Sequence, residues 1–299
     1  MTGGLRSATA CAWRQLSGIN PVDLALRLTL LDLLLRPIGA WQIRPVLLVL
    51  AGAGLLVPGW LRRPTLWFAL AALTALRSIV DWPLADNHAY LISYWCLAIG
   101  LSLIVRDTDG CLAFNGRLLI GLVFAFAVVW KLALSPDFLD GTFFRVTMLQ
   151  DPRFEDWTRL VTGISVDQLE AHRIALDRHL DAPPFAIEPG PALPTRFVWV
   201  ADATTIWTAA IELAVAVSFL WWRPGVLSRL RHALLIAFCV TTYAVATVEG
   251  FGWLLISMGV AQCNAHHLRT RCFYLASFAL ILGYREVPWA RLLAELAGS

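Results

Sequence analysis

The stretch RLLIGLVFAFAVVWKLAL, from Arg117 to Leu134, decides the fold class of this chain. It is apolar over nearly its whole length and is interrupted close to its end by Lys131. About 20 apolar residues are the length of a helix that crosses a membrane. Because the apolar residues are continuous and do not alternate with polar ones, the stretch predicts a helix and excludes an outer-membrane barrel strand.

Similar apolar segments recur along the chain. Of the 299 residues, 58% are hydrophobic and 15% are charged, and the mean hydropathy is +0.65. A soluble domain has about 45–50% apolar and about 25% charged residues. We therefore expect an all-α polytopic transmembrane bundle of about nine helices, with residues 1–299 forming a single domain. The expected segments are 22–38, 45–61, 65–80, 88–105, 117–135, 200–222, 231–248, 250–264 and 271–284.

The same composition excludes several classes of protein. A net charge of +3 without a basic stripe gives no support to nucleic-acid binding. Residues 1–20 are polar and lack the apolar core of a signal peptide, so we expect the first apolar helix to direct targeting. The six cysteines are scattered without a CxxC spacing, which predicts neither structural disulfides nor a thiolate metal site.

Arginines in short loops predict the orientation. Arg62 and Arg63 follow the second segment, and Arg223, Arg229 and Arg231 follow the sixth. The positive-inside rule places both loops in the cytoplasm, which predicts an inner-membrane protein with a cytoplasmic N-terminus. Two arginines count against this topology, because it places them outside: Arg36 and Arg44.

Residues 137–196 form the one sizeable polar insertion, and the topology places it outside the membrane. Ser165 to Gln168 reads as a capping box that opens a helix through about Leu180. Asp181-Ala182-Pro183-Pro184 ends that helix, and a shorter helix is expected at about 153–161. The insertion therefore predicts a small extracytoplasmic helical cap.

Lys131 is the most informative residue. It is the single lysine among 24 basic residues, although arginine is used everywhere else. A desolvated lysine can lose its proton and act as a base, whereas arginine cannot. An ionisable group in a membrane segment is a functional candidate. The alternative is a lysine near the helix end that reaches water over its apolar stem.

Asn87-His88-Ala89-Tyr90 opens the fourth segment, on the same side of the predicted topology as Lys131. His88 can shuttle a proton near neutral pH. The alternative is an interfacial histidine, with Asn87 as the N-cap of the helix.

Glu212 lies near the middle of its apolar segment, where a carboxylate must be paired, protonated or in contact with water. A structural ion pair, for example between Arg27 and Glu212, is the alternative to a functional role. His172 and His179 share a face of the cap helix, but no further ligand is spaced to join them, so we expect no metal.

These elements resemble a known family. Asn87-His88-Ala89-Tyr90-Leu91, followed by a helix that ends in Trp130-Lys131-Leu132 with Asp137-Phe138-Leu139 beyond it, is similar to the HTTM domain. This is the membrane domain of vitamin K-dependent γ-glutamyl carboxylase and its bacterial relatives. The resemblance covers about residues 80–300 loosely.

The resemblance implies a membrane enzyme, a quinol-oxygenating lyase, that binds a reduced, vitamin K-like quinone and uses no metal. Lys131 would deprotonate the quinol and His88 would be its polar partner. Asn87, Tyr90, Trp130, Glu212 and Arg27 would belong to the substrate-binding or polar network. The implied partners are a lipid-phase quinone or lipid, and an exported peptide or membrane protein. The alternative is a non-enzymatic quinone- or lipid-binding subunit, or an assembly partner of an exported redox system.

Overall fold

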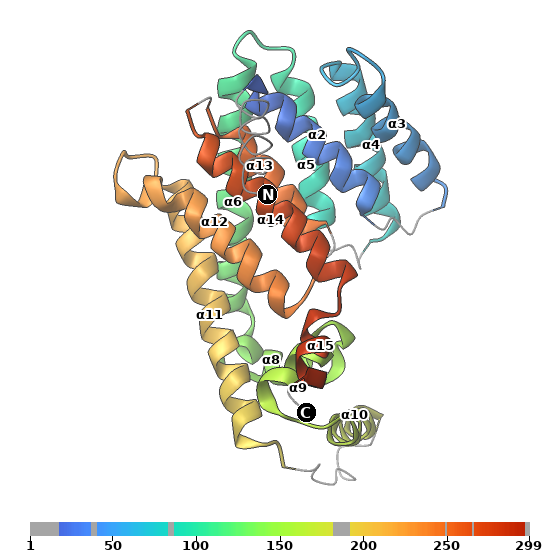
Figure 1. Cartoon of the computed structure of the whole chain (residues 1–299), viewed down its shortest axis with the longest axis vertical. Coiled ribbons are helices and arrows are strands. Elements are labelled where there is room, and N and C mark those ends of the chain that lie inside the picture. The colour runs from blue at the N-terminus through green and yellow to red at the C-terminus, as the bar shows by residue number, and fades with distance from the viewer. Residues whose placement is uncertain are drawn as a thin grey trace, which may run out of the picture. The chain divides into compact units, whose positions relative to one another are not determined.

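The computed structural model describes residues 18–36, 41–82, 87–181, 192–248, 250–264 and 266–296, and not the side chains of Asn87 and residues 178–181 (Figure 1). The described residues contain helices and no strand, which confirms the all-α class. In chain order the helices are α2 (Pro21–Leu35), α3 (Arg44–Leu56), α4 (Pro64–Val80), α5 (Asn87–Ser102), α6 (Thr108–Val129), η1 (Trp130–Leu134), α7 (Pro136–Leu139), α8 (Thr142–Gln150), η2 (Pro152–Phe154), α9 (Glu155–Thr162), α10 (Val166–Asp181), α11 (Thr195–Leu220), α12 (Val226–Val245), α13 (Phe251–Ala261), α14 (Leu268–Glu286) and α15 (Trp289–Leu296).

Each of the nine apolar segments contains a helix within the part of the chain that the structure describes. In order they correspond to α2, α3, α4, α5, α6 with η1, α11, α12, α13 and α14. Continuous apolar residues favour the helix, and Pro37 and Pro58, which lie inside two of the expected segments, fall just beyond the ends of α2 and α3. Each segment therefore contains a helix as expected, although the boundaries differ, most at the start of α6, which is Thr108 and not residue 117.

Two of the described helices are long and apolar enough to cross a membrane. Thr108–Leu134 has 27 residues and Thr195–Leu220 has 26. At 1.5 Å per residue each is about 40 Å long, more than the roughly 30 Å of a hydrocarbon core. The other apolar helices described do not reach that length and composition, so the predicted nine-span bundle is not confirmed.

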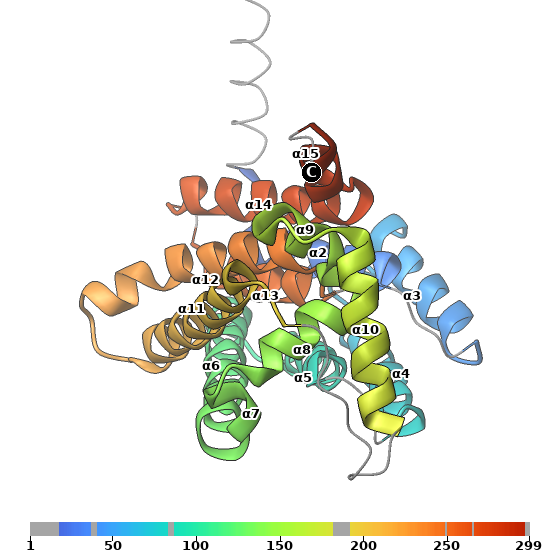
Figure 2. The ribbon, with the colours of Figure 1, turned by 90° about the horizontal axis from the view of Figure 1, so that it is seen from below.

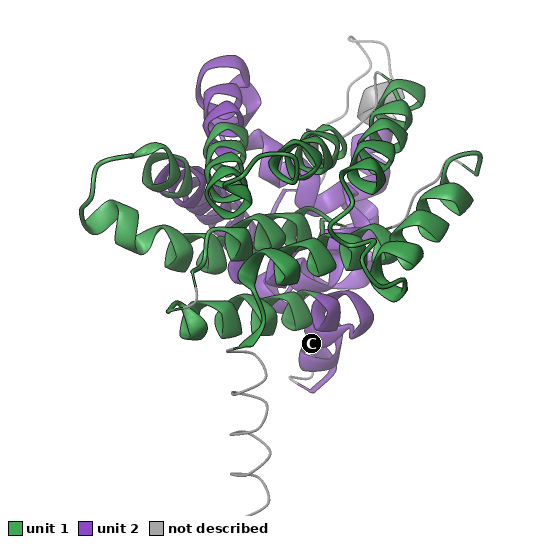
Figure 3. Ribbon diagram, turned by 90° about the horizontal axis from the view of Figure 1, so that it is seen from above, with its two compact units in different colours: residues 1–123, 215–239, 248–281 green, residues 124–214, 240–247, 282–299 purple. Residues whose placement is uncertain are grey.

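The chain divides into two compact units, each with its own packing (Figure 3). Unit 1 comprises residues 1–123, 215–239 and 248–281, and unit 2 comprises residues 124–214, 240–247 and 282–299. The unit boundaries fall within α6, α11, α12 and α14.

The core of unit 1 is formed by helix pairs. α4 packs along α5, and α13 packs against α2. α13 is buried from Gly252 to Ala261. Three tryptophans in this core each satisfy their indole N–H, which a buried tryptophan requires. Trp67 donates to the Leu61 carbonyl, Trp95 to the Thr29 hydroxyl and Trp253 to the Phe278 carbonyl.

An ion pair is buried in the same unit. Arg36 Nη2 lies 2.8 Å from Asp32 Oδ2 and donates to the Gly250 carbonyl at 2.7 Å. The side chains of Arg36 and Asp32 are 2% and 0% exposed. Arg36 is therefore a core residue and not a loop charge. Arg229 and Arg231, which the sequence analysis placed in a loop, lie within α12, and the predicted topology stays a prediction.

Residues 137–196 contain the predicted helices, and they belong to unit 2. Ser165 N–H donates to Gln168 Oε1 at 3.0 Å and Gln168 N–H donates to Ser165 Oγ at 3.2 Å, so the predicted capping box is confirmed. α10 ends at Asp181, and η2 with α9 covers 152–162, as the sequence predicted. α10 packs against α8, and α15 against α9 (Figure 2). Their apolar core is completed by Phe197 and Ala201 of α11.

The cysteines are free, as predicted, where the structure describes them. Cys96, Cys239 and Cys263 are buried, and Cys111 and Cys272 are half-buried. Cys11 lies outside the described residues.

Candidate functional site

Lys131 lies in a π-helical turn, η1, which continues α6 from Trp130 to Leu134. A π-turn inserts one extra residue into a helical turn and is found frequently at functional sites. Ser135 and Pro136 end the helix directly afterwards, because proline cannot donate the hydrogen bond that continuation requires. Lys131 thus occupies the last turn, where the helix dipole favours a positive charge.

Glu212 lies in α11, a helix of 26 residues without internal glycine or proline. Lys131 Nζ donates a hydrogen bond to Glu212 Oε1, and the two side chains form an ion pair. The side chains of Lys131 and Glu212 are 19% and 9% exposed. Both residues belong to unit 2, and 81 positions of sequence separate them.

The second oxygen of Glu212 is available. Oε2 is buried and accepts no hydrogen bond from any residue that the structure describes. A buried carboxylate oxygen without a donor costs free energy, which identifies this atom as a place for a donor group. Lys131 Nζ also lies 5.4 Å from the ring centroid of Phe138, a residue that is 2% exposed. The pair therefore combines one unused acceptor with apolar surroundings.

A second ion pair holds α8 against α11. Arg145 Nη2 lies 2.8 Å from Asp202 Oδ1, and these side chains are 34% and 44% exposed. Gly141, with φ +79°, lies so close that a Cβ there would approach Asp202 Oδ1 to 2.7 Å. This pair belongs to the same unit as Lys131 and Glu212 but is much more exposed, so it serves as a comparison for the buried pair.

The remaining residues of the predicted site lie as follows. Trp130 belongs to unit 2 and is exposed, whereas His88, Tyr90 and Arg27 belong to unit 1. His88 is half-buried, and its ring centroid lies 6.2 Å from that of Phe251. Tyr90 is half-buried on α5, and Arg27 is exposed on α2.

The structure thus brings together two of the predicted residues, Lys131 and Glu212. Glu212 pairs with Lys131, and not with Arg27. The joint action of His88 and Lys131 stays a prediction. Asn87 is the first residue of α5, but its side chain lies outside the described part, so the N-cap hypothesis is untested.

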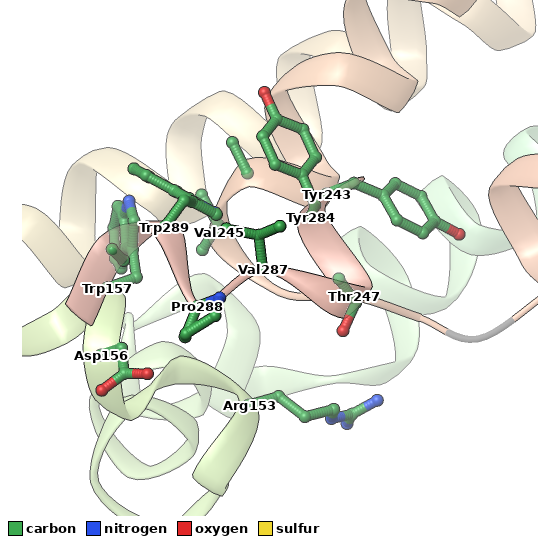
Figure 4. A pocket seen from close by; sticks show the side chains of 12 residues that line it. Arg153, Asp156, Trp157, Tyr243, Val245, Thr247, Tyr284, Val287, Pro288 and Trp289 are labelled. Atoms are coloured by element: carbon green, nitrogen blue, oxygen red, sulfur yellow. The ribbon is translucent and has the colours of Figure 1, made fainter. Parts of the chain in front are cut away.

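Unit 2 also contains a cavity of about 80 Å³ that the sequence did not predict (Figure 4). Residues from three parts of the chain line it: the start of the α9 region, the end of α12 and the turn between α14 and α15. Tyr243, Tyr284 and Trp289 provide aromatic walls, and Arg153 and Asp156 lie at its polar side. Lys131 and Glu212 are not among its lining residues. A cavity for a drug-sized ligand has about 300–1,000 Å³, so this one is too small for a quinone.

The described residues contain no group of three or more His, Cys, Asp or Glu side chains that could hold a metal ion. His172 is buried on α10, and the side chain of His179 lies outside the described part. Burial lowers the pKa of His172. This favours the neutral imidazole, which suits a packed side chain.

Comparison with known protein families, with curated proteins and with solved structures found no match to this chain.

Proposed function

We propose that this protein is an integral inner-membrane enzyme of the kind that the HTTM resemblance implies, and that the Lys131–Glu212 pair accepts a proton from a lipid-phase quinol. The carrying observation is the pairing of the single lysine of the chain with a buried carboxylate that retains an unused oxygen.

The two long apolar helices support insertion in a membrane. Only 22% of the most apolar window of Thr108–Leu134 and 39% of that of Thr195–Leu220 are buried. A core helix of a soluble protein buries most of its apolar side chains, whereas a helix in lipid can expose them. We propose that the other seven apolar helices complete a polytopic bundle with its N-terminus in the cytoplasm and residues 137–196 outside.

The chemistry of the pair suits a hydroxyl donor. An ammonium paired with a carboxylate is neutral overall, so its insertion among apolar groups is less costly than that of either charge alone. Glu212 Oε2 would accept the hydrogen bond of a hydroxyl. Lys131 would pass one proton to Glu212 and, as a neutral amine, take up the proton of the hydroxyl, so that the pair holds one additional proton. Lys131 would stabilise the negative charge that forms on the oxygen.

A reduced quinone fits these requirements. It has a hydroxyl for Glu212 Oε2 and an aromatic face for the apolar surroundings, which include Phe138. When bound, it would supply the acidic hydroxyl and the electron pair of the reaction. The residues of this chain would bind it, orient its hydroxyl and hold the proton at the Lys131–Glu212 pair.

The test uses purified full-length protein in lipid nanodiscs that contain a reduced vitamin K-like quinone. Aerobic oxidation of the quinol is followed by absorbance, and retained quinone is measured by mass spectrometry. Lys131→Arg keeps the positive charge but cannot release a proton near neutral pH. We expect it to lower turnover at least about 100-fold, the usual effect of losing a general base, while quinone is retained.

Asp202→Asn is the control, because it removes the carboxylate of the partly exposed ion pair on α11, the helix that also carries Glu212. Its turnover should stay within about twofold of wild type, since an exposed pair contributes little. Wild-type turnover in Lys131→Arg would reject the base role. If the wild-type protein neither retains a quinone nor oxidises a quinol, the proposed enzymatic function is rejected.

The non-enzymatic alternative, a quinone- or lipid-binding subunit or an assembly partner, is favoured by one observation. Glu212 already neutralises Lys131, as a purely structural ion pair would. This alternative predicts a stable protein partner in stoichiometric amount after gentle purification, with any bound quinone chemically unchanged.

A further inference from the structure

A second cluster of polar side chains lies in unit 1, where α12 and α14 begin, and the proposed function does not use it. Arg231 and His232 belong to α12, Tyr274 belongs to α14, and His267 directly precedes α14. The ring centroid of His232 lies 5.8 Å from that of Tyr274 and 6.1 Å from that of His267. Three aromatic side chains that can form hydrogen bonds therefore meet here.

The hydrogen bond between Tyr274 and His232 determines which imidazole nitrogen carries the proton. Tyr274 is 0% exposed, and its hydroxyl lies 2.8 Å from His232 Nδ1. The tautomer of His232 sets the direction of this hydrogen bond; because a buried phenol hydroxyl needs an acceptor, we assign the hydroxyl as the donor and Nδ1 as the acceptor. In neutral imidazole the proton then lies on Nε2. His232 Nε2 is buried and contacts no hydrogen-bond partner within the described ranges, so it is an unused donor.

Arg231 provides another unused donor. Its Nη1 donates to the carbonyl and the hydroxyl of Ser228, at 3.0 and 2.9 Å. Its Nε is buried and has no partner among the residues that the structure describes. Burial, followed by the charge of Arg231, lowers the pKa of the neighbouring His267. Two adjacent residues of one helix thus leave buried N–H groups unused.

The cluster is cationic, and none of the side chains described in it is a carboxylate. Residues 222–248 and 250–285 contain no aspartate or glutamate. The charges of Arg117 and Arg231 both act on His232. Arg117 stacks over Trp222 at 4.2 Å and donates to the Phe219 carbonyl at 2.7 Å. Neither arginine makes an ion pair with a carboxylate in the part of the chain that is described.

Like charges repel strongly where burial reduces the screening by water, so such a cluster is stabilised by an anion. We propose that these residues bind a phosphate group, carried by an anionic lipid headgroup or by a free phosphate ester. His232 Nε2–H and Arg231 Nε–H donate to its oxygens, and Arg117 contributes charge. Phosphate fits because it is anionic and has several strong acceptor oxygens. His267, whose ring lies beside that of His232, is exposed.

The experiment compares ligands that differ in the phosphate alone. Full-length protein in mild detergent is titrated with phosphatidic acid or with diacylglycerol of the same acyl chains, and bound lipid is measured by native mass spectrometry. Inorganic phosphate is titrated separately by calorimetry. Preference for phosphatidic acid without binding of inorganic phosphate identifies the lipid source. Comparable affinity for both identifies a free phosphate ester.

Arg231→Gln and His232→Phe should each weaken this binding at least about tenfold, because the first removes a positive charge and the second removes the Nε2–H donor to a charged ligand. Arg63→Gln is the control, because it removes the same charge from an exposed arginine of unit 1 that contacts Trp60. The affinity of Arg63→Gln for the phosphate ligand should stay within about twofold of that of wild type. An equal loss in Arg63→Gln would show unspecific attraction and overturn the proposal.

Tyr274→Phe tests the site with the smallest change in packing. It keeps the ring but removes the hydroxyl that directs the His232 proton to Nε2, so affinity should fall several-fold with unchanged helix content. This variant decides the question if the Arg231 and His232 variants do not fold. Wild-type protein that binds neither ligand, or variants that all bind like wild type, would overturn the proposal.

Discussion

Replacing Lys131 with methionine should destabilise the protein by about 2–4 kcal/mol, because Glu212 is left as a buried carboxylate without a partner. The Glu212 side chain is 9% exposed, so water compensates little of the loss. Holding a glutamate of ordinary pKa, about 4.3, in its protonated form at pH 7 costs about 3.7 kcal/mol. This cost is the upper end of the expected effect, and breaking buried pairs in other proteins costs about 3–5 kcal/mol.

The double variant Lys131→Met with Glu212→Gln should recover most of this loss and lie within about 1 kcal/mol of wild type. Two neutral side chains of similar size replace two charges, and such replacements are often neutral in stability. Glu212→Gln alone should cost about 1–2 kcal/mol, because Lys131 is 19% exposed and can reach water more easily.

The free energy of unfolding is measured by chemical denaturation in mild detergent, followed by far-ultraviolet circular dichroism. The comparison pair is Arg145→Met with Asp202→Asn, whose wild-type side chains are 34% and 44% exposed. A double-mutant cycle of these two substitutions should give a coupling free energy of about 0–1 kcal/mol between Arg145 and Asp202. A loss below about 1 kcal/mol for Lys131→Met, or a double variant no more stable than the single one, would refute the reasoning.

Three further effects follow from local geometry. Ser165→Ala removes the cap of α10 and should cost about 1 kcal/mol, seen as faster amide exchange in its first turn; unchanged exchange would contradict the capping role. Gly250→Ala should cost more than about 2 kcal/mol, because φ is +81° and the new Cβ would clash with the buried guanidinium of Arg36. Gly225→Ala is its control, because a Cβ there would have no atom within 4 Å, and it should change the free energy of unfolding by less than about 0.5 kcal/mol. Equal midpoints of thermal unfolding for the two glycine variants would argue against the Gly250 prediction. The free energy of unfolding should fall as the pH drops below 6.5. His172 takes up a proton there in the unfolded chain but not in the folded protein, where its pKa is lower. In His172→Gln this part of the pH dependence should disappear, and a profile identical to wild type would exclude His172 as its source.

Much of the secondary structure was predictable because its signals are local. The capping box of Ser165 and Gln168 lies within four consecutive residues, and the structure forms both of its hydrogen bonds. Apolar runs such as 200–222 give continuous helices, since burial and helix propensity favour the same conformation. The π-turn at Trp130–Leu134 was not predicted, because it depends on a small shift of hydrogen bonds that no residue pattern marks.

The candidate site was predictable in its members but not in its pairing. Lys131 and Glu212 each stand out as charges within apolar segments. Nothing in the sequence distinguishes Lys131 from Arg27 as the partner of Glu212. Lys131 and Glu212 are 81 positions apart, and which cation meets the carboxylate depends on how their helices pack. The His232 cluster was not predicted, because its members come from two helices and a loop, and because Arg231 was expected in a loop whereas the structure places it in α12.

The sequence by itself determined that the chain is helical, that it is strongly apolar and that a few ionisable residues lie within apolar segments, since these properties follow from composition and short-range periodicity. Only the tertiary structure decided that Lys131 meets Glu212, that Arg36 is buried against Asp32 and Gly250, and that His232 faces Tyr274. Burial and hydrogen-bond partners depend on contacts between residues that are distant in sequence, and these contacts determine which charges are compensated and which donors and acceptors are left for a ligand.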